Sequence, residues 1–398
     1  MKIYAQHGFG AGQRVINGLA EGTIDGVIFS ARYLKRESAM FSIEEIHKQS
    51  PDADILLDPE FYACLYADTP NAQLRHLNSW KSWNPCRRNE LETTESIEDI
   101  LKKTFQELLR FPLTAIIAPN IYIPKSFDSI EAVIAKNFIR KTRPIFTKFQ
   151  QKRPIYATLA IGCDALKNLS EFKDFLNDIT AISNPPDGFY ILIGGGITEE
   201  KTDITRSEII HADVIGGWML LNYTLSLNEF TIINGYSDIL TPFLVGSGGY
   251  AGATGWWNNL RSFSMSRYVS KTSGGQLPII RYLSNRLLNR VKFDEREAFS
   301  NILPEIDNGL PHDKDYKKGE IDRVVEILQT WEAIAQLNKQ VIVSDIHDTL
   351  KRLEIALTNA QVAYGRLSHS GFSIDVGVSN YINTLREGIS TFKKNAEI

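Results

Sequence analysis

The stretch DILLDPEFYA, residues 54–63, shows the pattern that decides the fold. Its short run of apolar residues predicts a buried strand. Pro59 has no backbone N–H to give to a sheet, so the strand is expected to end just before it. This order of residues places Asp58 at the end of the strand, at the edge of the predicted sheet.

Seven further apolar runs occur along the chain and alternate with stretches of helical periodicity. The predicted strands are Lys2–Ala5, Gly26–Phe29, Asp54–Leu57, Thr114–Ala118, Pro154–Ala160, Gly188–Ile193, Phe230–Ile233 and Tyr250–Ala253. The predicted helices are Gln13–Glu21, Ile43–Gln49, Ile97–Leu109, Ile130–Gln150, Leu169–Thr180, Val214–Leu227, Asp238–Val245 and Asn258–Val269. Eight βα units without an obvious edge strand indicate a parallel sheet that closes on itself. We therefore predict an α/β fold, a (β/α)8 TIM barrel over residues 1–290, with an open doubly wound sheet as the alternative.

Two long segments interrupt this alternation. Residues 67–96 follow the third strand and predict an insertion over the C-terminal face of the barrel, either a lid or a segment packed on the rim. Residues 291–320 contain EIDNGLPHDKDYKKGE, a polar composition that is typical of a linker. Helical spacing over Ile321–Leu337, Ile342–Leu367 and Ser379–Lys394 then predicts a mainly helical C-terminal domain, 321–398. Such a domain suits packing, a homo-oligomer or a protein partner.

Composition narrows the classes of protein. The chain has 44 Lys and Arg against 47 Asp and Glu, so its net charge does not by itself indicate nucleic-acid binding, although a local basic face stays possible. The cysteines Cys64, Cys86 and Cys163 are too few and too far apart for a disulfide framework or a CxxC zinc site. The chain has neither the apolar start of a signal peptide nor a run of 18 apolar residues. We expect a cytoplasmic protein that does not enter a membrane.

Polar side chains follow the predicted strands and would form one ring at the mouth of the barrel, where barrel enzymes keep their active sites. Asp58 and Glu60 can point to the same side, which suits general acid/base chemistry or a divalent cation. The alternative is that Asp58 braces its loop. His7 ends the first strand and is expected to face the pocket, and the glycines of the following GFGAG serve a phosphate or only the turn. The catalytic candidates are therefore Asp58, Glu60 and His7.

The same ring supplies candidates for substrate binding. They are Arg32, Tyr62, Asn120, Gly194, Gly195, Gly196, Asp238, Thr254, Trp256, Trp257 and Arg261. In GSGGYAGATGWWNNLR, residues 246–261, loop amides and a helix N-terminus are suited to a phosphate, to which Arg261 adds a charge. The two tryptophans either stack on a base or sugar or close the barrel end. The seven scattered histidines form no HxH or HExxH motif, so we predict no metal site and no cofactor.

Two stretches in the second half of the barrel resemble the transglycosylase barrels that exchange guanine for a deazaguanine in tRNA or DNA. GFYILIGGG, residues 188–196, resembles the family's base-contacting segment, and NGYSDILTPFLVGSGGYAGATGWWNNLR, residues 234–261, resembles the stretch that leads to its catalytic aspartate. The resemblance implies a similar barrel, a base-sized pocket and a second essential aspartate at Asp58. Thr254 occupies the position of the family's nucleophile and the family's zinc site is absent, so the usual covalent exchange is not implied.

Two hypotheses from different classes follow. In the first, the barrel is an enzyme that acts on a nucleotide, a nucleobase in nucleic acid or a phosphorylated sugar, with Asp58 as its general acid/base. In the second, it is a catalytically silent barrel that binds nucleic acid or a partner protein, because Thr254 replaces the expected nucleophile. A subunit of a larger assembly, regulated by its C-terminal helices, is a third possibility.

Overall fold

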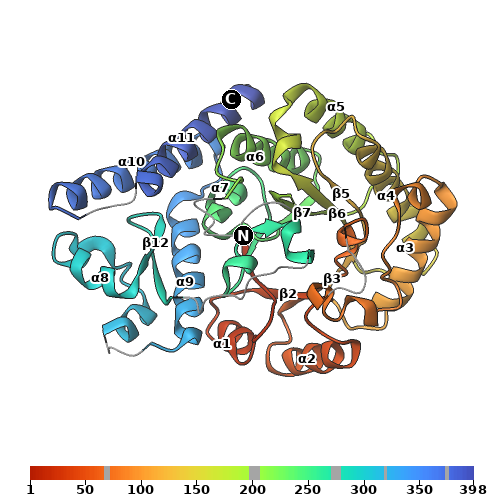
Figure 1. Ribbon diagram of the computed structural model, residues 1–398, viewed down its shortest axis with the longest axis horizontal. Coiled ribbons are helices and arrows are strands. Elements are labelled where there is room, and N and C mark those ends of the chain that lie inside the picture. The colour runs from red at the N-terminus through yellow and green to blue at the C-terminus, as the bar shows by residue number, and fades with distance from the viewer. Residues whose placement is uncertain (67–71, 197–206, 270–278, 318–320, 373–375) are drawn as a thin grey trace.

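Eight parallel strands form the centre of the molecule. The computed structural model describes residues 1–66, 72–196, 207–269, 279–317, 321–372 and 376–398 (Figure 1). The eight strands are β1 (Lys2–Gln6), β2 (Gly26–Ser30), β3 (Asp54–Asp58), β4 (Ile116–Ala118), β6 (Ile155–Gly162), β7 (Gly188–Gly195), β8 (Thr231–Asn234) and β9 (Ala251–Thr254). They are hydrogen-bonded in the order β3-β2-β1-β9-β8-β7-β6-β4. All eight strands predicted from the sequence are present.

The two end strands of this order lie next to each other, so the barrel is nearly closed. The backbone N–H of Thr114, just before β4, donates to the carbonyl of Ile55 in β3 at 2.9 Å. The Thr114 hydroxyl accepts from the Ile55 N–H, also at 2.9 Å. The fold is therefore α/β with a nearly closed parallel barrel of eight strands, and the open doubly wound sheet is excluded.

Seven helices surround the strands (Figure 1). They are α1 (Arg14–Ala20), α2 (Arg36–Gln49), α3 (Thr94–Leu108), α4 (Ile130–Thr147), α5 (Leu169–Thr180), α6 (Ala212–Leu227) and α7 (Thr241–Gly246). Local sequence signals explain some of their bounds. Ser129 begins α4 as its N-cap because its hydroxyl accepts from the backbone N–H of Ala132.

The last predicted barrel helix, Asn258–Val269, is wrong. The structure has two 3-10 turns there, Asn258–Leu260 and Met265–Tyr268, separated by the short strand β10 (Phe263–Ser264). This strand pairs in parallel with β7 at Gly194 and Gly195. A Cβ atom on Gly194 would lie 2.1 Å from the Phe263 carbonyl oxygen, so the missing side chain permits the pairing. Tertiary pairing thus overrides the helical spacing of this stretch.

The C-terminal third of the chain packs directly on the barrel. It contains the antiparallel hairpin β11 (Arg281–Ser284) and β12 (Asn289–Lys292), then α8 (Phe293–Ser300), α9 (Arg323–Val341), α10 (Ile346–His369) and α11 (Val376–Ala396). The rings of Tyr223 in α6 and Phe392 in α11 lie 5.7 Å apart. The predicted C-terminal helices are present, and α8 lies in the segment predicted as a linker, of which 318–320 are outside the described residues. The domain boundaries stay a prediction.

Candidate functional site

The C-terminal ends of neighbouring strands bring three buried polar side chains together. Gln6 ends β1, Ser30 ends β2 and Asp58 ends β3, and Ser30 and Asp58 are register partners. Each of the three side chains is almost completely buried. The sequence prediction that Asp58 reaches the barrel mouth is consistent with this position, because the strand ends at Asp58 immediately before Pro59.

Asp58 and Glu60, which we call the acid pair, share a network of hydroxyl groups. Asp58 Oδ1 accepts from the backbone N–H of Glu60 at 2.8 Å, and its Oδ2 accepts from the Tyr62 hydroxyl at 2.9 Å. Glu60 has a φ of 51°, the left-handed region that turns the chain back on itself. Its carboxylate accepts from the Tyr268 hydroxyl at 2.5 Å and from the Ser30 hydroxyl. The structure therefore brings three of the predicted site residues, Asp58, Glu60 and Tyr62, into one cluster.

The acid pair has no positively charged partner among the described residues, since none of the ion pairs found there includes Asp58 or Glu60. Burial raises the pKa of Asp58 to about 7, and the nearby Glu60 charge acts in the same direction. A carboxyl group with this pKa can give and take a proton near neutral pH, which is what a general acid/base needs.

Other buried acids of this region are paired with arginine. Arg290 in β12 donates from two nitrogens to the carboxylate of Asp238, at 2.5 and 2.6 Å. Burial acts to raise the pKa of Asp238, but the charge and hydrogen bonds of Arg290, together with the Arg261 charge and the Thr254 hydrogen bond, outweigh it and the pKa is lowered. Arg261 likewise contacts Glu326 of α9 at 3.2 Å. These ion pairs attach the C-terminal part of the chain to the barrel.

His7 lies in apolar surroundings. Its ring is 5.0 Å from that of Phe29 and 6.1 Å from that of Trp256. Burial lowers its pKa to about 3, so the imidazole is neutral at physiological pH. Its buried Nδ1 has no hydrogen-bond partner among the described residues. A catalytic role for His7 stays a prediction, but such a group is a weak proton carrier at neutral pH.

The predicted anion-binding arginines donate mainly to protein atoms. Arg32 donates to the Gln73 carbonyl, to the Arg267 carbonyl at 2.7 Å and to the Tyr33 hydroxyl. Arg261 donates to the Gly255 and Trp256 carbonyls in addition to Glu326. Both guanidinium groups thus hold loops of the mouth together, and their role in substrate binding stays a prediction.

Thr254, at the position of the transglycosylase nucleophile, is bonded within the protein. Its hydroxyl donates to Asp238 Oδ1 at 2.7 Å, and its carbonyl accepts from the indole N–H of Trp331 at 3.2 Å. The structure therefore places Asp238 and Thr254 together. They contact the β11–β12 hairpin and α9 and do not belong to the acid-pair cluster.

The glycine stretch 194–196 is covered by the chain itself. Besides the β10 pairing, Ser264 donates to the Gly196 carbonyl at 3.1 Å. The Phe263 ring lies 5.3 Å from that of Tyr62, edge-on. Asn120 lies elsewhere, where its amide donates to the Thr158 carbonyl at 2.8 Å. Gly194, Gly195 and Gly196 are thus bonded to residues 263 and 264 of the chain itself.

The two tryptophans are bonded to the loop that follows β1. The indole N–H groups of Trp256 and Trp257 both donate to the Phe9 carbonyl, at 2.8 and 3.0 Å. The Arg14 guanidinium lies 5.7 Å and 6.0 Å from their ring centroids. These contacts match the alternative in which the tryptophans serve closure.

The insertion after β3 is anchored on the rim. Trp80 donates to the Ala31 carbonyl at 2.8 Å, and Trp83 donates to the Glu60 carbonyl at 3.1 Å. Both indole groups are buried. Residues 67–71 of the predicted insertion lie outside the described residues. The described part therefore holds the backbone of the acid pair in place.

Sequence reasoning missed three members of the site: Gln6, Tyr190 and Tyr268. Tyr190 in β7 donates to Gln6 Oε1 at 3.4 Å, and Gln6 Nε2 has no partner among the described residues. A glutamine that ends an otherwise apolar strand was an available signal for Gln6. Tyr268 had no such signal, because the stretch that carries it was predicted to be a helix on the outside of the barrel.

Comparison of the chain with protein-family models and with curated proteins found no match. Within the described residues, no group of three or more His, Cys, Asp or Glu side chains is arranged to hold a metal ion. None of the described helices is both long enough and apolar enough to cross a membrane.

Proposed function

We propose that the chain is a TIM-barrel enzyme that acts on a nucleotide, a nucleobase in nucleic acid or a phosphorylated sugar, with Asp58 as general acid/base. One observation carries this proposal: two carboxyl groups are buried side by side at a barrel mouth with only neutral hydrogen-bond donors as described partners. A buried carboxylate without a cation is costly for stability. Such a cost is typical of active sites, where a shifted pKa serves proton transfer.

Cleavage or exchange of a glycosidic bond is the reaction class that fits two carboxyl groups best. One group protonates the leaving group, and the other activates the nucleophile or stabilises the cationic sugar in the transition state. Asp58 suits the first role because its pKa lies near 7, and Glu60 suits the second. The resemblance to the transglycosylase barrels supports the same class. A covalent route through position 254 is not part of the proposal, because Thr254 is bonded to Asp238.

The test combines binding with a chemical readout. The protein is titrated into labelled tRNA, single-stranded DNA and duplex DNA over a salt series. The mass of the recovered nucleic acid is then measured by mass spectrometry. A changed mass that is lost in Asp58→Asn supports the proposal. The matched control is Asp164→Asn, which makes the same change in an exposed carboxylate just after β6. If Asp58→Asn keeps the wild-type rate, Asp58 has no part in the mechanism.

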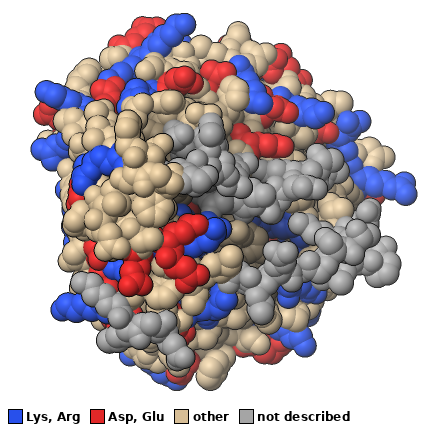
Figure 2. Space-filling model, turned by 60° about the vertical axis from the view of Figure 1, so that its left-hand side comes forward, with Lys and Arg blue, Asp and Glu red and all other residues tan. Residues whose placement is uncertain are grey.

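A catalytically silent barrel is the second candidate, and the covered glycine stretch favours it. Phe263 of β10 pairs with Gly194 in the sheet, within the stretch that resembles the family's base-contacting segment. Salt-dependent nucleic-acid binding without a change in mass supports this reading. Figure 2 shows basic and acidic side chains mixed over the face in view, with no broad patch of one sign outside the grey atoms. Modest affinity with a shallow salt slope is therefore expected on this face.

A homo-oligomer or a protein partner at the C-terminal helices is proposed for α10. Ile355 and Val362 on this helix are large apolar side chains that are about half exposed. The mass of the wild-type protein in solution, compared with the mass of the Val362→Gln variant, tests this, because Val362 does not line the pocket between α9 and α10. A monomeric mass at all concentrations contradicts self-association.

A further inference from the structure

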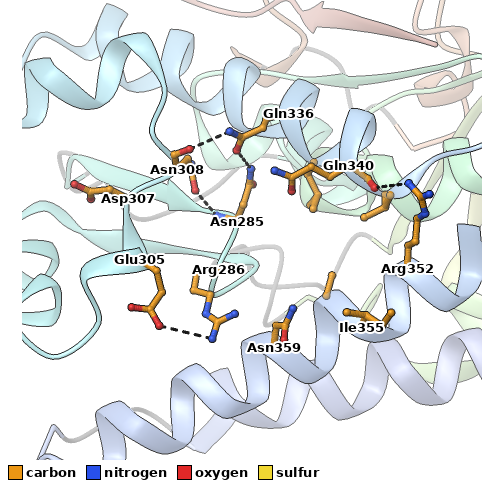
Figure 3. Close-up of a pocket in the computed structure, with 13 residues that line it drawn as sticks. Asn285, Arg286, Glu305, Asp307, Asn308, Gln336, Gln340, Arg352, Ile355 and Asn359 are labelled. Atoms are coloured by element: carbon orange, nitrogen blue, oxygen red, sulfur yellow. Dashed lines mark hydrogen bonds and ion pairs between the residues drawn. The ribbon is translucent and has the colours of Figure 1, made fainter.

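A polar pocket lies outside the barrel, between the β11–β12 hairpin, α9 and α10 (Figure 3). Its volume is about 370 Å³. The hairpin turn supplies Asn285 and Arg286, α9 supplies Gln336 and Gln340, and α10 forms the opposite wall. In Figure 3, Arg286 and Arg352 lie towards opposite ends of the pocket, with Asn359 and Ile355 between them. No residue of the acid pair lines this pocket.

The pocket has an excess of positive charge. Its two acids, Glu305 and Asp307, are each bound by an arginine that does not line it: Arg366 contacts Glu305, and Arg296 contacts Asp307 at 2.6 Å. The two arginines that do line it are less engaged. Arg286 lies 3.7 Å from Glu305, and Arg352 donates to the Gln340 carbonyl at 3.2 Å. Four arginines thus face two carboxylates, which leaves two positive charges for an anionic group.

Three buried polar atoms in the wall lack a hydrogen-bond partner among the described residues. They are Asn285 Oδ1, Arg286 Nε and Asp307 Oδ1. Leaving such an atom unpaired destabilises the folded protein. The set contains one donor and two acceptors, so a ligand that satisfies it needs an acceptor for the guanidinium and hydroxyl or amino donors for the two oxygens. A simple anion such as phosphate provides the acceptor for the guanidinium but no donors for the two oxygens.

Size and apolar surface narrow the class of ligand further. Small-molecule sites usually have volumes of roughly 300–1,000 Å³, so this pocket suits a mononucleotide better than a dinucleotide or a polymer. Ile355, whose side chain is 51% exposed, offers a flat apolar contact beside the polar groups. The amides of Gln340 and Asn359 can read the polar edge of a base.

We propose that this pocket binds a nucleoside monophosphate. The phosphate lies at Arg286, the ribose hydroxyl groups donate to Asn285 and Asp307, and the base contacts Ile355 near Arg352. The binding site is separate from the acid pair, so it provides a second ligand site on the protein and does not depend on the proposed reaction.

The experiment is calorimetric titration of the full chain with adenosine 5′-monophosphate, adenosine and inorganic phosphate. We expect the monophosphate to bind at least tenfold more tightly than either of the other two. Arg286→Gln/Arg352→Gln is expected to weaken it at least tenfold, and so is Asn359→Asp, which places a negative charge on an exposed position of the wall. The matched control Lys339→Gln/Lys351→Gln removes the same charge from exposed neighbours that do not line the pocket and is expected to bind normally.

Three outcomes overturn the inference. The first is absence of monophosphate binding. The second is that inorganic phosphate binds with the same affinity as the monophosphate, which would show that the amides and Ile355 do not contact the nucleoside. The third is binding that Asp58→Asn abolishes and the arginine double variant retains, because this would place the nucleotide at the barrel mouth. The Asp58 variant also separates failure of this inference from failure of the proposed function.

Discussion

Replacing Asp58 by Asn should stabilise the protein at high pH while it removes activity. Asn has the shape of the protonated acid, so it keeps the acceptor for the Glu60 N–H and can pair with the Tyr62 hydroxyl in place of Oδ2. A residue that is needed only to brace its loop would show the opposite result, a loss of stability on substitution. The variant therefore separates a chemical role for Asp58 from a structural one.

The sign of the effect follows from proton binding. The pKa of Asp58 is raised in the folded protein to about 7, against roughly 3.9 for an unfolded chain. Between these values the folded state holds more protons than the unfolded state, so stability falls as the pH rises. At about 1.4 kcal/mol per pKa unit, a shift of about three units corresponds to about 4 kcal/mol. This loss of free energy of unfolding is complete above pH 7 and absent below pH 4.

Urea unfolding of both proteins at pH 5 and at pH 8 measures this difference. We expect Asp58→Asn to be more stable than wild type at pH 8 by at least about 2 kcal/mol, half of the full shift. The gap should narrow at pH 5. Asp164→Asn is the control and should leave the pH dependence unchanged, because that carboxylate is exposed. A variant that is less stable than wild type at pH 8 would refute the reasoning and assign Asp58 to bracing its loop.

Four further substitutions test the fold around the site. Arg290→Met leaves Asp238 buried without its partner and should lower the free energy of unfolding in urea by about 3–5 kcal/mol. Adding Asp238→Asn should restore part of this loss. An unchanged unfolding midpoint would show that the ion pair contributes nothing to stability. Gly194→Ala should cost about 1–3 kcal/mol, because its Cβ meets the Phe263 carbonyl. Gly196→Ala should be neutral, because no atom of the described residues lies within 4 Å of its Cβ. Equal effects of the two glycine variants would argue against the β10 pairing.

The barrel strands were predictable from the sequence because parallel strands are buried on both faces. Residues such as Val27, Ile28, Leu56 and Leu57 are almost fully buried, and short continuous apolar runs of this kind are a strong signal. Strand β10 was not predictable. Its pairing depends on the close approach of Phe263 to Gly194, residues that are 69 positions apart, and no local pattern encodes such a contact.

The candidate site was predictable only for residues that belong to strand ends. Asp58 and Glu60 follow an apolar run, and the geometry of a parallel barrel sends such residues to the mouth. What each polar residue contacts is set by segments that arrive from elsewhere in the chain. Arg290 and Glu326 come from the C-terminal part of the chain. Arg290 forms an ion pair with Asp238, and Glu326 forms one with Arg261.

The buried acids at the barrel mouth differ in their partners. Asp238, a buried carboxylate that joins the barrel to the hairpin, is paired with Arg290. The acid pair lies at the same mouth, equally buried, and its described partners are tyrosine and serine hydroxyls and one backbone N–H. A hydroxyl group stabilises a carboxylate far less than a guanidinium does, so one proton of the pair stays available near neutral pH. If Asp58 only braced its loop, an amide in its place would make the barrel less stable, and that difference in stability is measurable.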